Sequence, residues 1–207
     1  MRKWIAVAAA VLLTAAGAAA FRWLAGGEET PRAATFRGER TTDHYIPIAT
    51  RALDPEPLTV AEVFPADSVA SGGTTLLRAG TETLTGCAEA VWGTVETAVA
   101  GCTQALRARY ATPDGRVSGQ FLIFNLADSA AADRLVAALK GGGFVRTAPG
   151  TPEGFDGSRS RAQARALGHY VTVSWVAPVG TGGRVDLTEP QVALDSLGFV
   201  IQKRLVK

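Results

Sequence analysis

The sequence predicts an α+β fold in which an antiparallel sheet carries its helices packed on one face. The order strand, turn, strand, helix occurs twice, over residues 103–140 and again over 159–205. Two hairpins that are each followed by a helix favour this arrangement, a ferredoxin-like variant built from two strand–strand–helix units. One N-terminal transmembrane helix is expected before the domain, because residues 4–20 are almost purely apolar.

Residues 1–25 have the features of a signal anchor. Arg2 and Lys3 precede the apolar run, which predicts a cytoplasmic N-terminus and an extracytoplasmic domain. A membrane-spanning helix needs about 20 apolar residues, and the segment from Trp4 to Ala25 reaches that length if Arg22 extends toward the outer head groups. Ala18-Ala19-Ala20 also fits a signal-peptide cleavage site, so a cleaved, secreted protein is the alternative.

Residues 26–57 are expected to form an extracytoplasmic tether, and residues 58–207 the extracytoplasmic domain. The tether runs from Gly26-Gly27 to Asp54-Pro55-Glu56-Pro57, a composition that buries little apolar surface. Within it, residues 44–48 form an apolar patch that we expect to be extended. Thr59 and Glu62 have the spacing of a capping box, which predicts a short helix at the start of the domain.

The remaining elements follow from turn signals and apolar periodicity. Thr112-Pro113-Asp114-Gly115 predicts a hairpin turn, and Leu167-Gly168-His169 predicts a second tight turn. The pattern predicts strands over 74–79, 103–111, 116–125, 144–146, 159–166 and 170–177, and helices over 85–100, 128–140 and 189–205.

Cys87 and Cys102 are the only cysteines, and in an oxidising compartment they predict a disulfide. A straight helix between them would separate them by about 22 Å, whereas a disulfide needs Cα atoms within about 7 Å. We therefore expect the helix over 85–100 to break at Gly93 and double back. The alternative is one continuous helix with two free thiols.

The exported part of the chain is close to neutral. Of the 21 Lys and Arg residues, Arg2, Lys3 and Arg22 lie in the first segment, and the other 18 face 19 acidic residues, a net charge of −1. Nothing in this balance indicates nucleic-acid binding. Abundant arginine and alanine are typical of a GC-rich genome, such as that of an actinobacterium.

The sequence predicts no catalytic, cofactor-binding or metal-binding residues, and no enzymatic activity. His44 and His169 are the only histidines, and with two cysteines they make too few ligands for a zinc site. No nucleophile elbow is present. The glycine-rich loop over 180–183 lacks the Gly-Lys-Ser/Thr ending of a nucleotide-binding loop.

Five arginines form a candidate anion-binding face. Alternation places Arg159, Arg161 and Arg165 on one side of a strand, and Arg107 and Arg109 on one side of another. In a one-sided sheet these arginines would form an outer face that could bind an anionic wall polymer or a lipid head group. The alternative is a solvated face whose arginines pair with acids. The expected core residues are Leu106, Ala108, Tyr110, Val173 and Trp175.

Three segments resemble those of actinobacterial membrane-anchored or secreted proteins of unknown function. They are Gly86-Cys87 through Gly101-Cys102, Leu106-Arg107-Ala108-Arg109-Tyr110, and Tyr170-Val171-Thr172-Val173-Ser174-Trp175. The resemblance covers residues 58–207 and implies a single anchor and an extracytoplasmic domain. It implies no activity and no site residues.

These observations together predict a single-pass membrane protein with an extracytoplasmic domain that binds or senses an unidentified ligand at the cell envelope. Its expected partners are the lipid bilayer, through the N-terminal helix, and an envelope protein or an anionic wall polymer. The alternatives are a secreted protein, an envelope enzyme with an unrecognised site, and a structural subunit of a membrane complex.

Overall fold

The computed structural model describes residues 31–206, so the expected signal anchor over residues 1–25 lies outside the described residues. Within residues 31–206, no helix is both long enough and apolar enough to cross a bilayer. The described elements, in chain order, are β1 (Thr35–Glu39), η1 (Asp43–Ile48), α2 (Val60–Val63), β2 (Ser68–Ser71), β3 (Thr74–Leu84), η2 (Cys87–Ala90), β4 (Val91–Gly93), α3 (Val95–Ala98), β5 (Gln104–Ala111), β6 (Val117–Asn125), α4 (Ser129–Ala138), β7 (Gly143–Val145), η3 (Gly157–Arg159), β8 (Arg161–Leu167), β9 (Tyr170–Pro178), α5 (Thr188–Asp195) and η4 (Ser196–Val206).

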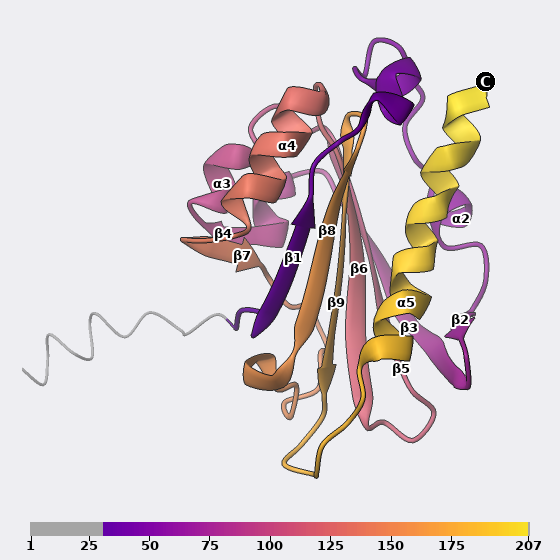
Figure 1. The fold of residues 1–207 in the computed structure, drawn as a ribbon, viewed down its shortest axis with the longest axis vertical. Helices are drawn as coiled ribbons and strands as arrows, with labels where there is room; N and C mark the ends of the chain where they lie inside the picture. The colour runs from indigo at the N-terminus through magenta and orange to yellow at the C-terminus, as the bar shows by residue number, and fades with distance from the viewer. Residues whose placement is uncertain (1–30, 207) are drawn as a thin grey trace, which may run out of the picture. The chain divides into compact units, whose positions relative to one another are not determined.

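Seven strands form one mixed, strongly twisted sheet in the order β1-β8-β9-β6-β5-β3-β2 (Figure 1). Every neighbouring pair is antiparallel except β1 and β8, which run parallel with Thr35 opposite Arg161. β4 and β7 pair separately. The β5–β6 and β8–β9 hairpins confirm the two hairpins that the turn signals predict.

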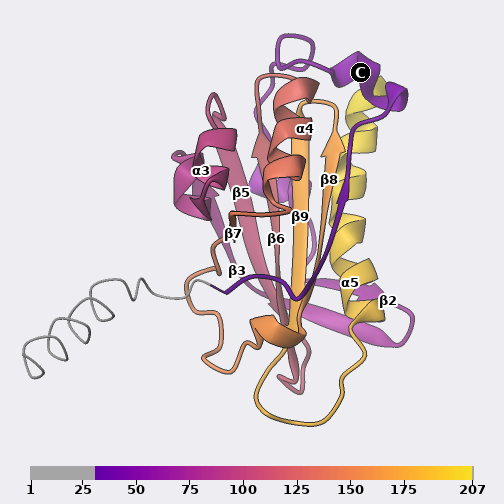
Figure 2. The same ribbon diagram turned by 60° about the vertical axis from the view of Figure 1, so that its left-hand side comes forward.

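Helices cover both faces of the sheet (Figures 1 and 2). On one face α4 packs against β8 and β9, and α3 and the β4–β7 pair lie beside it; on the other face α5 packs against β9, β6 and β3. Two hydrophobic cores result, one around Trp175 and Phe144 and the other around Tyr110 and Phe121. The predicted ferredoxin-like fold with helices on one face is therefore wrong.

The prediction fails at β6 and β9, which are buried along their whole lengths. The polar side chains of Ser118, Gln120, Thr172 and Ser174 suggest a water-facing side, yet each residue is at most 5% exposed. A strand that is buried on both sides lies in the middle of a sheet covered on both faces.

Residues 31–57 are part of the domain and do not form the expected tether. β1 is an edge strand, and the Phe36 ring packs edge-on against Phe144 with centroids 5.6 Å apart. The patch expected to be extended is the 3₁₀ helix η1, which buries Ile48 to 1% exposure. Single apolar residues among charged ones are therefore enough to attach residues 31–57 to the domain. Phe36 packs against one hydrophobic core, and Ile48 belongs to the other.

The disulfide and the broken helix are both confirmed. Cys87 and Cys102 are bonded with their Cα atoms 6.1 Å apart, and η2, β4 and α3 replace one continuous helix. Gly93 has a φ of +69°, and a Cβ there would lie 2.3 Å from the carbonyl oxygen of Gly142. Only glycine suits both constraints, so the chain reverses at this position.

Candidate functional site

The five arginines of the predicted anion-binding face do not share a face of the sheet. Cross-strand pairing places Arg107 and Arg109 on the side that α4 covers, and Arg161 and Arg165 on the side that α5 covers. Arg159 lies in η3, before β8 begins. Alternation along a strand shows which of its residues share a face of the sheet. It does not show whether the arginines of β5 and those of β8, which are three positions apart in the sheet order, share the same face.

Three of these arginines are held by bonds within the fold. Arg107 is 4% exposed, and its Nε lies 3.0 Å from an Oε atom of Glu82. Arg109 donates to the carbonyl oxygens of Pro149, in a loop, and of Ala79, in β3. Arg159 pairs with Asp156 and donates to two carbonyls of the glycine-rich loop. These side chains join neighbouring strands and fasten loops to the sheet.

A small pocket opens between the β1 edge of the sheet and the C-terminal helical segment formed by α5 and η4. Its volume is about 170 Å³, close to the roughly 150 Å³ of a cavity that accepts benzene. We call it the helix-side pocket. It is lined by Glu39, Arg40, Thr42, Tyr45, Arg165, Ala166, Leu167, Thr172, Asp195, Gly198, Phe199 and Gln202.

Arg165 is shared between two carboxylates of the helix-side pocket. Its Nε lies 3.0 Å from Glu39 Oε2, and its Nη2 lies 3.6 Å from Asp195 Oδ2. Arg37 also pairs with Glu39, its Nε lying 3.0 Å from Oε1, but the Arg37 side chain is 74% exposed and water screens this pair. Arg40 is 77% exposed and pairs with Asp133 instead. The least exposed charges are therefore two negative groups and one positive group.

Asp195 is the most buried of these charges, with a side chain that is 15% exposed. It accepts hydrogen bonds from the hydroxyl of Ser174 and from Nε2 of Gln191, the latter at 3.3 Å. Burial raises the pKa of Asp195 above its ordinary value, although the Ser174 hydrogen bond and the Arg165 charge act in the opposite direction. A carboxyl group with a raised pKa in a pocket is a common feature of functional sites.

Three separate parts of the chain build this site. Glu39 comes from the edge strand β1, Arg165 from β8, and Asp195 from the last turn of α5. Gln191 and Asp195 are four residues apart, so they share one side of α5 and both reach Ser174 on β9.

Aromatic and polar side chains also line the helix-side pocket. Tyr45 from η1 and Phe199 from η4 both line it, and Phe199 is 57% exposed. Thr172 and Gln202 add a hydroxyl and an amide. The site therefore combines carboxylates, hydrogen-bonding groups and aromatic rings, which together suit a small polar molecule.

A second buried charge network has a structural role. Arg204 on η4 has a side chain that is 2% exposed and bonds Asp54, Glu62 and the hydroxyl of Tyr170 at 2.8–3.1 Å. Its contacts join η4 to the chain before and within α2. His169 lies beside Tyr170, where burial lowers its pKa. The sequence suggests an exposed turn at His169, but the residue is completely buried.

In residues 31–206, no group of three or more His, Cys, Asp or Glu side chains is arranged to hold a metal ion. Comparisons with protein-family models, with curated proteins and with solved structures each found no match to this chain. The resemblance to actinobacterial envelope proteins thus stays a prediction, and the functional argument depends on the chain's own residues.

Proposed function

We propose that this chain is a single-pass membrane protein whose extracytoplasmic domain binds a small polar molecule with an ammonium group. The binding site is the helix-side pocket. The observation that carries the proposal is the largely buried carboxylate of Asp195, whose contact with Arg165 is 3.6 Å long, while the same guanidinium lies 3.0 Å from Glu39; two aromatic residues line the same pocket.

An ammonium group would give Asp195 a cationic partner of its own, whereas it now shares the Arg165 guanidinium with Glu39. Charge-assisted hydrogen bonds of this kind are about twice as strong as neutral ones. The rings of Tyr45 and Phe199 also favour a cation, because the face of an aromatic ring is electronegative. The small volume excludes a drug-sized ligand, since such ligands need about 300 Å³ or more.

Binding of this ligand competes with protonation of Asp195. A cation near the carboxylate favours its charged form and lowers its pKa. The affinity for an ammonium ligand is therefore expected to fall as the pH drops through the pKa of folded Asp195.

Binding is favoured over catalysis because the pocket offers no activated nucleophile. Ser174 is 1% exposed, and its hydroxyl donates a hydrogen bond to Asp195. No histidine lines the helix-side pocket, so this serine has no base of the usual kind.

The proposed location is supported by the sequence and by the disulfide. Arg2 and Lys3 before an apolar run favour an anchor with a cytoplasmic N-terminus. The Cys87–Cys102 bond is typical of an oxidising compartment outside the cytoplasm.

The ligand proposal is tested by calorimetry and thermal melting of the full chain in a neutral detergent, with ethanolamine and acetate as probes. Ethanolamine is expected to bind and raise the melting temperature, and acetate is not. Asp195→Asn should abolish binding, whereas Glu153→Gln, which removes an exposed carboxylate outside the pocket, should not. Equal binding of acetate, or unchanged binding by Asp195→Asn, would refute the proposal.

The location is tested by non-reducing mass spectrometry of the protein from its native host's membranes. An intact N-terminus together with a bridged Cys87–Cys102 peptide would support the anchored protein. A chain in the medium that begins at Phe21 would instead establish a secreted protein.

A further inference from the structure

The β1 edge of the domain carries a group of exposed cations, of which Arg40 alone also lines the helix-side pocket. We call this group the basic edge; its members are Arg37, Arg40, Arg134, Lys140, Arg161 and Arg184. We propose that the basic edge binds a linear polyanion, a phosphate-bearing polymer of the cell envelope. This inference goes beyond the proposed function and rests on it only for the extracytoplasmic location.

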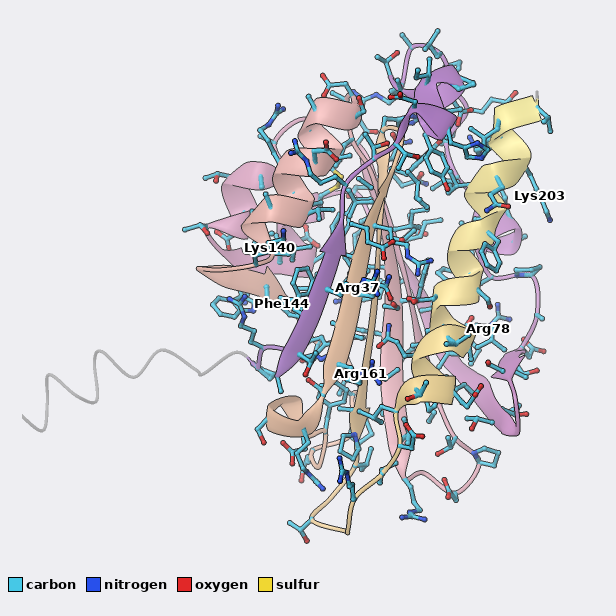
Figure 3. The ribbon with its side chains drawn as sticks, viewed as in Figure 1. Arg37, Arg78, Lys140, Phe144, Arg161 and Lys203 are labelled. Atoms are coloured by element: carbon cyan, nitrogen blue, oxygen red, sulfur yellow. A yellow bond between two sulfur atoms is a disulfide. The ribbon has the colours of Figure 1, made fainter. Side chains whose placement is uncertain are left out.

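Two hollows concentrate the cations at either end of β1. One, of about 590 Å³, lies against α4 and is lined by Arg40, Arg134 and Lys140. The other, of about 710 Å³, lies where β1 begins and is lined by Arg161 and Arg184. Figure 3 shows Lys140 on the α4 side of β1, and Arg37 and Arg161 on the side toward α5.

The carboxylates near the basic edge are already engaged. Asp133 pairs with Arg40 and accepts a hydrogen bond from the Thr41 amide at 2.8 Å. Glu39 pairs with Arg37. Asp186 lines the second hollow with Arg161 and Arg184 and accepts a hydrogen bond from the Thr188 amide. Within residues 31–206, Arg134, Lys140 and Arg184 form no ion pair, so their charges are available to a ligand.

The backbone of β1 adds further donors to this surface. β1 ends the sheet order, so only its inner edge is paired with β8. The amide groups on its outer edge therefore face away from the sheet, where they can donate to phosphate oxygens between the two hollows.

The spacing of the cations favours a chain over a compact anion. The five residues of β1 separate the hollows, which corresponds to about 17 Å at 3.3 Å per residue. A single phosphate can contact one hollow only, whereas a linear polymer can contact both.

A nucleic acid fits this surface less well than a polymer without bases. Single-stranded nucleic acids are bound through aromatic side chains on which bases stack. Phe36 is the aromatic residue of β1, and its ring packs inward against Phe144. The basic edge thus offers positive charge along its length, and none of its six members is an aromatic residue on which a base could stack.

Fluorescence anisotropy of labelled linear polyphosphate, titrated with the full chain in neutral detergent, tests the inference. Polyphosphate should bind far more tightly than inorganic phosphate, with an affinity that falls steeply as salt rises. The double variants Arg134→Gln/Lys140→Gln and Arg161→Gln/Arg184→Gln should each weaken binding about tenfold, because each removes two cations near the polymer.

Lys203→Gln is the matched control, because Lys203 is an exposed cation on η4, away from β1 (Figure 3). It should bind polyphosphate as the unchanged protein does, and so should Asp195→Asn. The inference is overturned if both double variants bind like Lys203→Gln, if inorganic phosphate binds as well as the polymer, or if oligothymidylate binds more tightly than polyphosphate.

Discussion

Asp195 is a largely buried charge that lowers the stability of the fold and that we propose binds the ligand. Burial raises its pKa, so the folded protein holds this proton more tightly than the unfolded chain does. The resulting stabilisation is complete below the ordinary pKa of 3.8 and is lost as the pH rises through the folded pKa. At neutral pH the charged carboxylate is therefore a cost to the fold.

Asp195→Asn is expected to increase the free energy of unfolding at pH 7 by about 1 kcal/mol, because a neutral amide removes a desolvated charge. The amide oxygen can still accept from Ser174, and Arg165 keeps Glu39. Urea unfolding at pH 7 measures the change. A loss of stability at pH 7 would show that the Arg165 pair outweighs the burial of the charge.

His169 contributes a dependence of stability on pH that has the opposite sign to that of Asp195. Its Nδ1 lies 2.8 Å from the Ile48 carbonyl, its Nε2 has no partner, and burial lowers its pKa below 6.5. The unfolded chain therefore binds this proton more readily, and the stability that neutral His169 provides is lost as the pH falls below 6.5.

Unfolding measured from pH 7.5 to pH 5 should show this loss of stability in the unchanged protein and a smaller loss in His169→Asn, which retains an amide donor near the carbonyl. His44→Asn replaces an exposed histidine and should leave the pH dependence unchanged. A pH dependence shared by all three proteins would assign the effect to other groups.

At the scale of elements, the Arg204 network fastens the C-terminal helical segment to the chain around α2. Removing one partner of a buried pair leaves the other charge without compensation, which costs about 3–5 kcal/mol. Arg204→Met is expected to lose that much unfolding free energy, because the Asp54 side chain is only 6% exposed.

The double variant Arg204→Met/Asp54→Asn should recover part of the loss, since it removes the two most buried charges of the network and leaves Glu62, whose side chain is 28% exposed. Denaturant unfolding of the two variants and of the unchanged protein gives the comparison. A cost below about 1 kcal/mol for Arg204→Met would place this pair among weak surface pairs.

Local signals predicted elements well and their assembly poorly. The Thr112–Gly115 turn, the capping box at Thr59 and the break at Gly93 each depend on a few neighbouring residues, and the structure contains all three. The β1–β8 pairing joins residues 35 and 161, and no local pattern indicates a partner at that distance.

The candidate pocket was missed for the same reason. Gln191 and Asp195 share one side of a predicted helix, and that signal was available in the sequence. Glu39, in contrast, lies in a segment whose composition indicates a tether, and its meeting with Arg165 depends on the unexpected parallel strand.

At the scale of the whole molecule, residues 31–57 are expected to be required for folding. A chain that begins at residue 31 should melt cooperatively, whereas one that begins at residue 58 should not, because it lacks Phe36, Ile48 and the buried partner of Arg204. Circular dichroism during heating distinguishes the two chains. Equal melting of both chains would show that residues 31–57 are a tether that folding does not require.

The parallel pairing of β1 also sets an order of events during folding. β1 is the first strand in the described part of the chain, and its partner β8 follows only after more than a hundred further residues. The antiparallel strands between β8 and β2 can pair through shorter loops, which close at lower entropic cost. The sheet is therefore completed late, by its own first strand, and until then the edge of β8 is open to strands of other molecules.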